Sequence, residues 1–218
     1  MCWNPDISIN TFIFGTLTLV FIYYSNTYTK YKIPIFDNLW FFVFSFLVIS
    51  MQLVEYFIWK NIDVKNLNHF YSVVACIVLI LQPLALMMMV KQEHIRYSLL
   101  FFYILFMIFF TTNIVKINSK NTITTVSPNG HLLWNFLIFS GYEYIYMVIY
   151  MFFYLFTAYQ INFQFFIFLT TFFLASFIIN FKDKTWGTMW CWSSNLVWIY
   201  LIIRITIYLP FLEYNKLC

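Results

Sequence analysis

The sequence predicts an all-α protein: a polytopic transmembrane helix bundle of about seven spans, forming a single domain over residues 1–218. Hydrophobic residues make up 63% of the chain and charged residues only 9%, against about 25% charged in a typical soluble domain. Apolar runs of about 20 residues, enough to cross ~30 Å of hydrocarbon, recur along the whole chain. A soluble fold could not cover such a core with so few charges. Disorder is excluded because disordered chains are polar and poor in aromatic residues.

Each expected span is an apolar run between polar or charged residues. Helices are favoured over barrel strands, because the runs are continuous and about twice the ~10 residues of a membrane strand. The first run lacks the basic start and small-residue cleavage site of a removable signal peptide. The apolar stretch 132–159 is too long for one upright helix, so we expect an interfacial segment at 132–142 before the fifth span. The seven expected spans are approximately 7–24, 39–59, 70–90, 97–115, 143–159, 163–181 and 188–209.

Seven spans place the two termini on opposite sides of the membrane and sort every loop by side. The N-terminal face carries the loops 60–69, 116–142 and 182–187. The other face, called the tail face below, carries 25–37, 91–96, 160–162 and the C-terminal tail. Basic residues in these loops number six on the N-terminal face and five on the tail face, so the positive-inside rule assigns no orientation. The expected location is an integral, multi-pass position in a membrane, with the choice of membrane and the oligomeric state left open.

Tryptophan residues gather on one side of the expected bundle. Of the eight in the chain, those at or near the N-terminal face are Trp3, Trp59, Trp134, Trp186, Trp190 and Trp192. Tryptophan favours the headgroup zone, but an aromatic belt lines both interfaces, and this distribution is one-sided. Two interpretations therefore stay open: a membrane-anchoring belt, or the walls of a binding cavity.

Polar residues inside the spans are the main candidates for a site. Glu55 is the carboxylate that every plausible boundary leaves inside the membrane, where an ionisable group costs about 2.5–3.5 kcal/mol and usually faces the bundle interior. Gln52 shares its helix face, and Ser45 continues that face. A structural hydrogen bond between helices is the alternative role for Glu55. Glu143 opens the fifth span, where the helix dipole also favours a carboxylate.

The third span contains Gln82-Pro83 near its middle. Proline removes one backbone donor and bends a helix, so the carbonyl that it frees needs a partner, either Gln82 or a group on a neighbouring helix. A bend at this point opens space inside the bundle. In the last span Arg204 lies towards the tail face, and we expect it to reach the headgroups there.

Cysteine and histidine residues on the N-terminal face supply two further hypotheses. Cys2 and Cys191 are expected to form a disulfide if this face is oxidising, and to remain free thiols otherwise. His69 and His131 are weak metal-ligand candidates, because no His-x-x-x-His or Cys-x-x-Cys spacing accompanies them. The sequence contains no P-loop, no Gly-x-Ser-x-Gly and no His-Glu-x-x-His. It therefore predicts no cofactor and no resident metal.

Four short motifs carry a resemblance to a known family. They are Met1-Cys2-Trp3, Gln82-Pro83 in the third span, Gly130-His131 followed by Trp134, and Trp190-Cys191 in the last span. In these the chain resembles an uncharacterised family of small seven-helix membrane proteins that begin Met-Cys-Trp. The resemblance implies a multi-pass fold and supplies no activity. Family members carry a Cys pair before the Gly-His element, where this chain reads NTITTVSPNG.

These residues favour a non-enzymatic protein with a polar, Trp-lined pocket on the N-terminal face, which binds a small molecule or a lipid headgroup as a receptor or in transport. The expected lining residues are Gln52, Glu55, Gln82, Glu143, Trp3, Trp134 and Trp190. One alternative is an intramembrane, metal-dependent lipid hydrolase that uses His69, His131, Glu55 and Glu143 as metal ligands. The other is a structural or assembly protein of the membrane. The expected partner is the lipid bilayer and no nucleic acid, because the basic residues are scattered.

Overall fold

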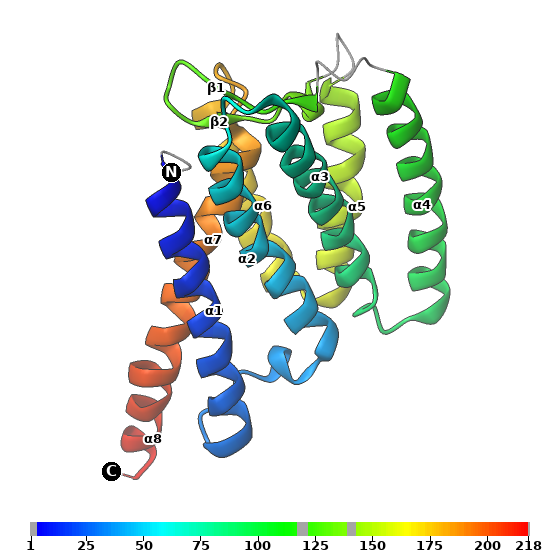
Figure 1. The fold of residues 1–218 in the computed structure, drawn as a ribbon. Helices are drawn as coiled ribbons and strands as arrows, with labels where there is room; N and C mark the ends of the chain where they lie inside the picture. The colour runs from blue at the N-terminus through cyan, green and yellow to red at the C-terminus, as the bar shows by residue number, and fades with distance from the viewer. Residues whose placement is uncertain (1–3, 117–121, 139–142, 218) are drawn as a thin grey trace.

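The computed structural model describes residues 4–116, 122–138 and 143–217 as a bundle of long helices (Figure 1). Within these residues, seven helices are long and apolar enough to cross a membrane, which confirms the predicted all-α transmembrane bundle. The last of them is continuous through three segments, α7, a π-helical turn (η4) and α8. The helices are α1 (Pro5–Tyr28), α2 (Leu39–Lys60), α3 (Lys65–Met87), α4 (Glu93–Lys116), α5 (Glu143–Ile161), α6 (Phe163–Asn180), α7 (Trp186–Ile203), η4 (Arg204–Tyr208) and α8 (Leu209–Leu217).

Asparagine caps fix where several helices begin, slightly outside or at the edge of the apolar runs. The side chain of Asn4 accepts a hydrogen bond from the Ile7 amide at 2.8 Å, and that of Asn38 accepts one from the Trp40 amide at 2.9 Å. Such a cap satisfies a backbone N–H group that the first turn leaves free. Asn162 has an extended backbone and caps α6 in the same way, so α5 and α6 form two helices instead of one.

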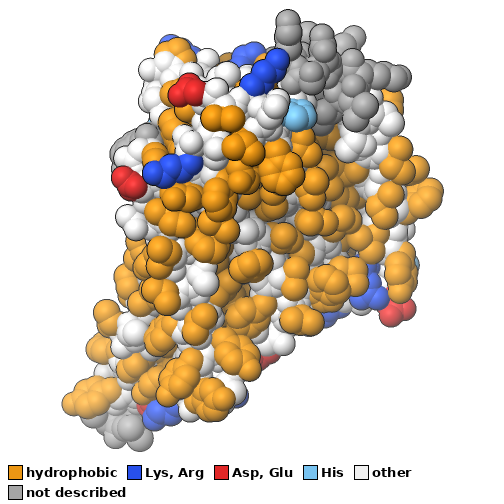
Figure 2. Space-filling view, in the orientation of Figure 1, with side chains coloured by type: hydrophobic (Ala, Val, Ile, Leu, Met, Phe, Trp, Pro, Cys, Tyr) orange, Lys and Arg blue, Asp and Glu red, His pale blue; other side chains and the backbone are white. Residues whose placement is uncertain are grey.

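The surface of the bundle accounts for the hydrophobic composition. Figure 2 shows hydrophobic side chains over the middle of the molecule and charged side chains towards its two ends. Leu17, Ile178 and Ile179 are 63%, 72% and 77% exposed. Soluble monomers rarely expose large contiguous apolar patches, so this band is the lipid-facing surface. The start of α1 and the end of α8 lie at opposite ends of the bundle (Figure 1), as seven spans require.

The central helix is α2, which packs most extensively on α3 and α1 and also contacts α7. Its contact with α1 is close at Gly15, where a Cβ atom would lie 2.9 Å from Ile49 Cγ1. Small residues allow helix backbones to approach in membranes. In contrast, α4 packs only at the edge, against α3 and α5 (Figure 1).

Pro83 lies inside the continuous helix α3, and a neighbouring helix supplies the hydrogen-bond donor that it lacks. Pro83 cannot donate to the carbonyl of Leu79 four residues earlier, and the Tyr150 hydroxyl of α5 donates to that carbonyl at 2.9 Å. The Tyr103 hydroxyl of α4 donates to the next carbonyl, that of Ile80, also at 2.9 Å. The carbonyl freed by Pro83 was expected to bond either to Gln82 or to a neighbouring helix, and the neighbouring helix supplies the donor. The Gln82 amide turns to α2 instead, where it donates to the Leu47 carbonyl at 3.5 Å.

A short hairpin lies between α4 and α5 at the N-terminal face. Its strands, β1 (Thr125–Val126) and β2 (Leu132–Leu133), are antiparallel, with Thr125 opposite Leu133. Gly130 in the turn has φ 79°, a conformation that favours glycine. The expected interfacial segment 132–142 begins as β2 and a 3₁₀ turn, η3 (Asn135–Leu137), and residues 139–142 lie outside the described residues.

Candidate functional site

Hydrogen bonds fix the hairpin to the N-terminal end of α3. The Asn68 amide donates to the carbonyls of Ile62 at 3.0 Å and Thr124 at 2.9 Å, and its oxygen accepts from the Thr124 N–H at 2.9 Å. The hydroxyls of Ser72 and Thr124 are 2.7 Å apart. Asn68 and Ser72 are both 0% exposed. The hairpin is therefore part of the packed structure and not a loose loop.

The other side of the hairpin is held by the α6–α7 connection. The Asn129 amide donates to Asp183 Oδ2 at 3.1 Å and to Thr185 Oγ1 at 2.9 Å. The Thr188 hydroxyl of α7 donates to the Leu132 carbonyl at 3.2 Å. The hairpin is thus hydrogen-bonded to α3 on one side and to α7 on the other, so it covers this end of the bundle.

Trp134 and Phe136 follow the hairpin and pack into the bundle. Both are 3% exposed, and their rings are stacked with centroids 5.7 Å apart. They form one hydrophobic cluster with residues of α2, α3 and α7, among them Met51 and Ala75. Trp134, expected as a pocket wall, thus contributes mainly to the interior packing of the N-terminal half.

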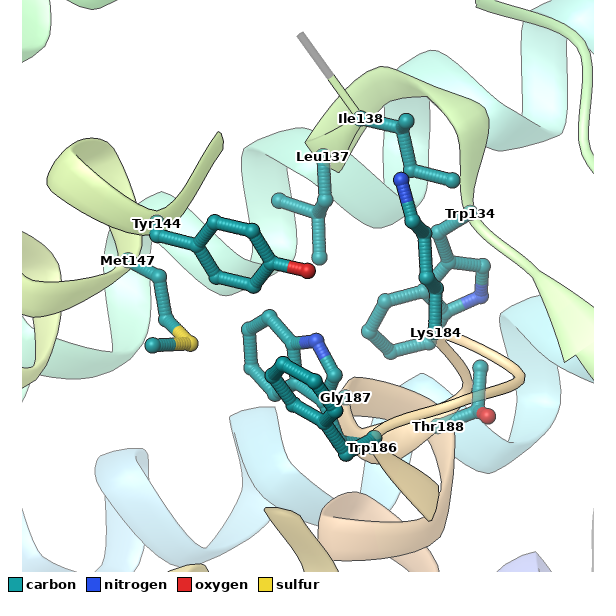
Figure 3. Close-up of a pocket in the computed structure, with 10 residues that line it drawn as sticks. Trp134, Leu137, Ile138, Tyr144, Met147, Lys184, Trp186, Gly187 and Thr188 are labelled. Carbon is teal, nitrogen blue, oxygen red and sulfur yellow. The ribbon is translucent and has the colours of Figure 1, made fainter. Parts of the chain in front are cut away.

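A small pocket remains beside Trp134. The rings of Trp134, Tyr144 and Trp186 border it, from the segment after the hairpin, from α5 and from α7 (Figure 3). Its volume is about 20 Å³, and an adjoining space has about 50 Å³. A single water needs about 10–15 Å³, so these spaces suit a few water molecules.

Gln52 and Glu55 are buried in the interior. The exposed fractions of their side chains are 2% and 0%, which agrees with the expected inward direction of this face of α2. The oxygen of Gln52 accepts a hydrogen bond from the Thr11 hydroxyl of α1 at 2.9 Å. Its amide nitrogen has no partner among the described residues. Glu55 lies close enough to Cys191 of α7 for the two groups to interact electrostatically.

The other expected residues of the N-terminal face are placed only in part. Trp3, Cys2 and the side chain of Glu143 lie outside the described residues. Cys191 is buried and forms no disulfide with another described cysteine. The N-terminal ligand pocket and the disulfide between Cys2 and Cys191 therefore stay predictions.

The two candidate histidines lie in or beside the hairpin region. His69 Nδ1 and the Thr122 hydroxyl are 2.5 Å apart. His131 is 8% exposed, and its burial lowers its pKa below the usual value, while the charge of Asp183 opposes this shift. Among the described residues, no three His, Cys, Asp or Glu side chains gather closely enough to hold a metal ion.

A larger cavity, called the tail cavity below, lies in the other half of the bundle. Its volume is about 480 Å³, within the range of about 300–1,000 Å³ for small-molecule sites. It is enclosed by α2, α5, α6 and α7, by Gln82 of α3 and by the loop residues 33–36, which include part of the 3₁₀ turn η1 (Pro34–Asp37). Of the residues expected to line a pocket, Gln82 and Trp190 line this one.

Aromatic rings form a large part of the wall of the tail cavity. They are Phe36, Phe41, Phe44, Tyr154, Phe165, Phe168, Trp190, Trp198 and Tyr200. Tyr154 and Trp190 close the end nearer the N-terminal face, edge to face with centroids 4.9 Å apart. These rings are suited to an apolar chain or ring.

Most polar lining residues lie towards the tail face, and Ser194, eight residues into α7, lies nearer the inner end. Ser45 lies six residues into α2 and Gln82 five residues before the end of α3, so both are about 8–9 Å from that end at 1.5 Å per residue. Asn162 and Gln164 lie at the α5–α6 turn, which is on the tail face itself. The hydroxyl of Ser45 is buried and has no hydrogen-bond partner among the described residues.

Arg204 is the cation of the tail cavity. It lies 18 residues after the start of α7, a rise of about 27 Å, which places it near the tail-side edge of ~30 Å of hydrocarbon. It opens the π-helical turn η4, a feature frequent at functional sites. Its Nη1 donates to the Tyr200 hydroxyl at 3.2 Å, whereas its Nε is buried and has no partner among the described residues.

No protein carboxylate balances this charge within the described part of the chain. The described lining residues include no Asp and no Glu, and Arg204 is in neither of the two described ion pairs. Glu213 of α8 pairs with Lys30 and accepts a hydrogen bond from the Tyr31 hydroxyl at 2.9 Å. The hydrogen bond that Lys30 donates to Glu213 raises the pKa of Lys30 above its usual value, which favours the charged form of that pair.

Other hollows differ from the tail cavity in their lining. One of about 700 Å³ between α4 and α5 is lined by lipid-facing side chains such as Phe102 and Val148, both of which are 59% exposed. Such a groove is filled by the lipid chains of the bilayer. About half of the residues that line the tail cavity are buried, among them Phe44, Gln82 and Tyr154, so the cavity reaches into the interior.

The sequence patterns did not predict that the residues of the tail cavity lie close together. Ser45, Asn162 and Ser194 lie on three different elements, and each is unremarkable alone. The available signal was Arg204 inside an apolar span, four residues after Tyr200 and on the same helix face.

No family model, no curated protein and no solved structure matches this chain. The geometry itself establishes a multi-pass helical membrane protein whose N-terminal end is covered by a hairpin. Its tail-face half contains an aromatic cavity with one arginine.

Proposed function

We propose that this protein binds an amphipathic, lipid-like ligand in the tail cavity, as a receptor or a transport-related protein would. The observation that carries the proposal is the division of the cavity lining. Tyr154 and Trp190 close the inner end, while Gln82, Asn162, Gln164 and Arg204 lie towards the tail face, beside further aromatic rings such as that of Phe41. This order matches a molecule with an apolar body and one polar end.

The membrane setting determines which interactions give such binding its selectivity. A lipid chain that leaves the bilayer for the cavity gains little hydrophobic free energy, because lipid tails are as apolar as the cavity wall. Close packing against the aromatic rings and hydrogen bonds to the polar end therefore have to supply the preference. A polar group at the tail-face end also gives a partner to the buried hydroxyl of Ser45, which is costly to leave unsatisfied.

Two neighbouring serines of α7 allow a matched test. Ser194 lines the tail cavity, and Ser193 is not among its lining residues. Both hydroxyls bond to their own helix: Ser194 donates to the Cys191 carbonyl at 2.7 Å and Ser193 to the Trp190 carbonyl at 2.6 Å. Ser194→Phe and Ser193→Phe thus make the same chemical change, but only Ser194→Phe puts a ring into the cavity.

The experiment is native mass spectrometry of the protein released from nanodiscs, with lipid analysis of the bound fraction. We expect the wild type and Ser193→Phe to retain a bound amphiphile and Ser194→Phe to lose it. Equal retention by both variants would place the ligand elsewhere. A wild type that retains no amphiphile would contradict the proposal and favour a structural role in the membrane.

A further inference from the structure

We infer that the ligand of the tail cavity carries an anionic headgroup, a carboxylate or a phosphate, and that Arg204 binds it. This inference rests on the proposed function and specifies its ligand class. Three observations support it: the charge balance of the cavity, the free edge of the guanidinium, and the depth of Arg204 in the membrane.

The charge balance of the cavity favours a bound anion. Arg204 is the cation among the described lining residues, and these include no carboxylate. Glu213, the carboxylate of the neighbouring helix α8, is already bound by Lys30 and Tyr31. A cation near the edge of hydrocarbon pairs with another group or reaches the headgroups. A bound anion inside the cavity supplies that pair.

The geometry of the guanidinium leaves one side for the ligand. Nη1 donates to the Tyr200 hydroxyl at 3.2 Å, which holds the group in place. Nε is buried without a partner among the described residues, so the Nε side is the one that remains to bind. Arginine binds carboxylate and phosphate with two parallel N–H donors, which lysine cannot do. Asn162 and Gln164 line the same end of the cavity and can donate through their amides.

The depth of Arg204 favours a lipid over a water-soluble anion. The residue is about 27 Å along α7 from the N-terminal side, which is the level of the tail-side headgroups in a bilayer of ~30 Å hydrocarbon. The aromatic wall continues inward from Arg204 to Trp190 and Tyr154. A single-chain lipid with a carboxylate or a phosphate monoester fits both ends, and inorganic phosphate would leave the aromatic end empty.

Photo-crosslinking in nanodiscs of neutral phosphatidylcholine tests the inference with three diazirine probes. They share one type of chain and differ in headgroup: palmitic acid, lysophosphatidic acid and cetyl alcohol. Peptide mapping reports labelling of residues that line the tail cavity, such as Phe44 and Trp190. The variants are Arg204→Gln, Arg204→Lys and, as a control that removes one positive charge from the exposed tail-face loop, Lys32→Gln.

We expect at least one anionic probe to label the wild-type cavity about tenfold more strongly than cetyl alcohol, equivalent to about 1.4 kcal/mol. Arg204→Gln reduces that labelling to the level of the alcohol, Arg204→Lys gives an intermediate value, and Lys32→Gln matches the wild type. Unchanged cetyl alcohol labelling in Arg204→Gln shows that the cavity is still folded. The stronger of the two anionic probes identifies the headgroup as carboxylate or phosphate.

Other outcomes overturn the inference in separate ways. If cetyl alcohol labels the wild-type cavity as strongly as both anionic probes, the headgroup assignment is wrong while the lipid cavity stands. If Arg204→Gln keeps the preference for the anionic probe, Arg204 is not the binding group. If excess inorganic phosphate alone abolishes labelling, the ligand is the free anion. If none of the probes labels the cavity, the proposed function fails as well.

Discussion

Tyr150→Phe tests how the bundle accommodates the proline of α3. The substitution removes one hydroxyl, which donates to the Leu79 carbonyl at 2.9 Å. In an ordinary helix that carbonyl would be bonded by the N–H of residue 83, but Pro83 has none. The loss therefore leaves a buried acceptor that α3 itself cannot satisfy.

The magnitude follows from this lack of an alternative donor. Hydrogen bonds between membrane helices contribute about 0.6 kcal/mol on average and about 1.7 kcal/mol at most, whereas an unsatisfied buried group costs about 1–3 kcal/mol. We expect Tyr150→Phe to reduce the free energy of unfolding by about 1.5 kcal/mol, near the top of the first range. In a Pro83→Ala background, the new alanine N–H can bond to the Leu79 carbonyl, and the same substitution should cost only about 0.5 kcal/mol.

The assay is a double-mutant cycle on reversible unfolding in mixed micelles. We expect a coupling of about 1 kcal/mol between positions 83 and 150, since the two residues share one carbonyl. Tyr23→Phe is the control, because Tyr23 is 58% exposed on α1. Equal costs of Tyr150→Phe in both backgrounds would refute the role of Tyr150 as the donor that replaces the missing N–H of Pro83.

Three further substitutions test the packing and the hairpin. Gly15→Ala should destabilise the protein by about 1 kcal/mol, because overpacking against Ile49 outweighs the better helix propensity of alanine. In an Ile49→Ala background Gly15→Ala should become stabilising, and thermal unfolding that shows no change of sign would refute the close contact. Burial lowers the pKa of His131, so the unfolded state takes up a proton first, and stability should fall as pH drops below the unfolded value of about 6.5. Unfolding midpoints measured against pH should lose this dependence in His131→Gln, and an identical pH profile would exclude His131 as its source. Asn68→Ala should cost about 1–3 kcal/mol and expose the hairpin to limited proteolysis; Asn66→Ala, at an exposed position of the same helix, should change neither, and an intact hairpin in both variants would contradict its attachment to α3.

The helical fold could be predicted from the sequence because the membrane imposes one length scale on every span. Runs of about 20 apolar residues leave a helix as the simple way to satisfy the backbone. The helix ends were less accessible, since they depend on caps such as Asn4 and Asn38, which lie beyond the apolar runs. The hairpin was not predicted, because each of its strands is only two residues long and its anchor, Asn68, lies 56 residues before Thr124.

The candidate site was only partly predictable for a related reason. Helix periodicity shows which residues of one helix share a face, as for Gln52 and Glu55, but it does not show which faces of different helices meet. Arg204 was recognised as a cation inside a span and assigned to the headgroups. That it shares a cavity with Ser45 of α2 and Gln164 of α6 depends on tertiary packing.

The most direct measurement of the central claim is a crystal structure of the protein grown from a lipidic mesophase. We predict elongated electron density in the tail cavity, with its polar end within hydrogen-bond distance of Arg204 Nε and its chain directed towards Trp190. A cavity that contains only water, or one that side chains fill completely, would contradict the proposed lipid-binding function.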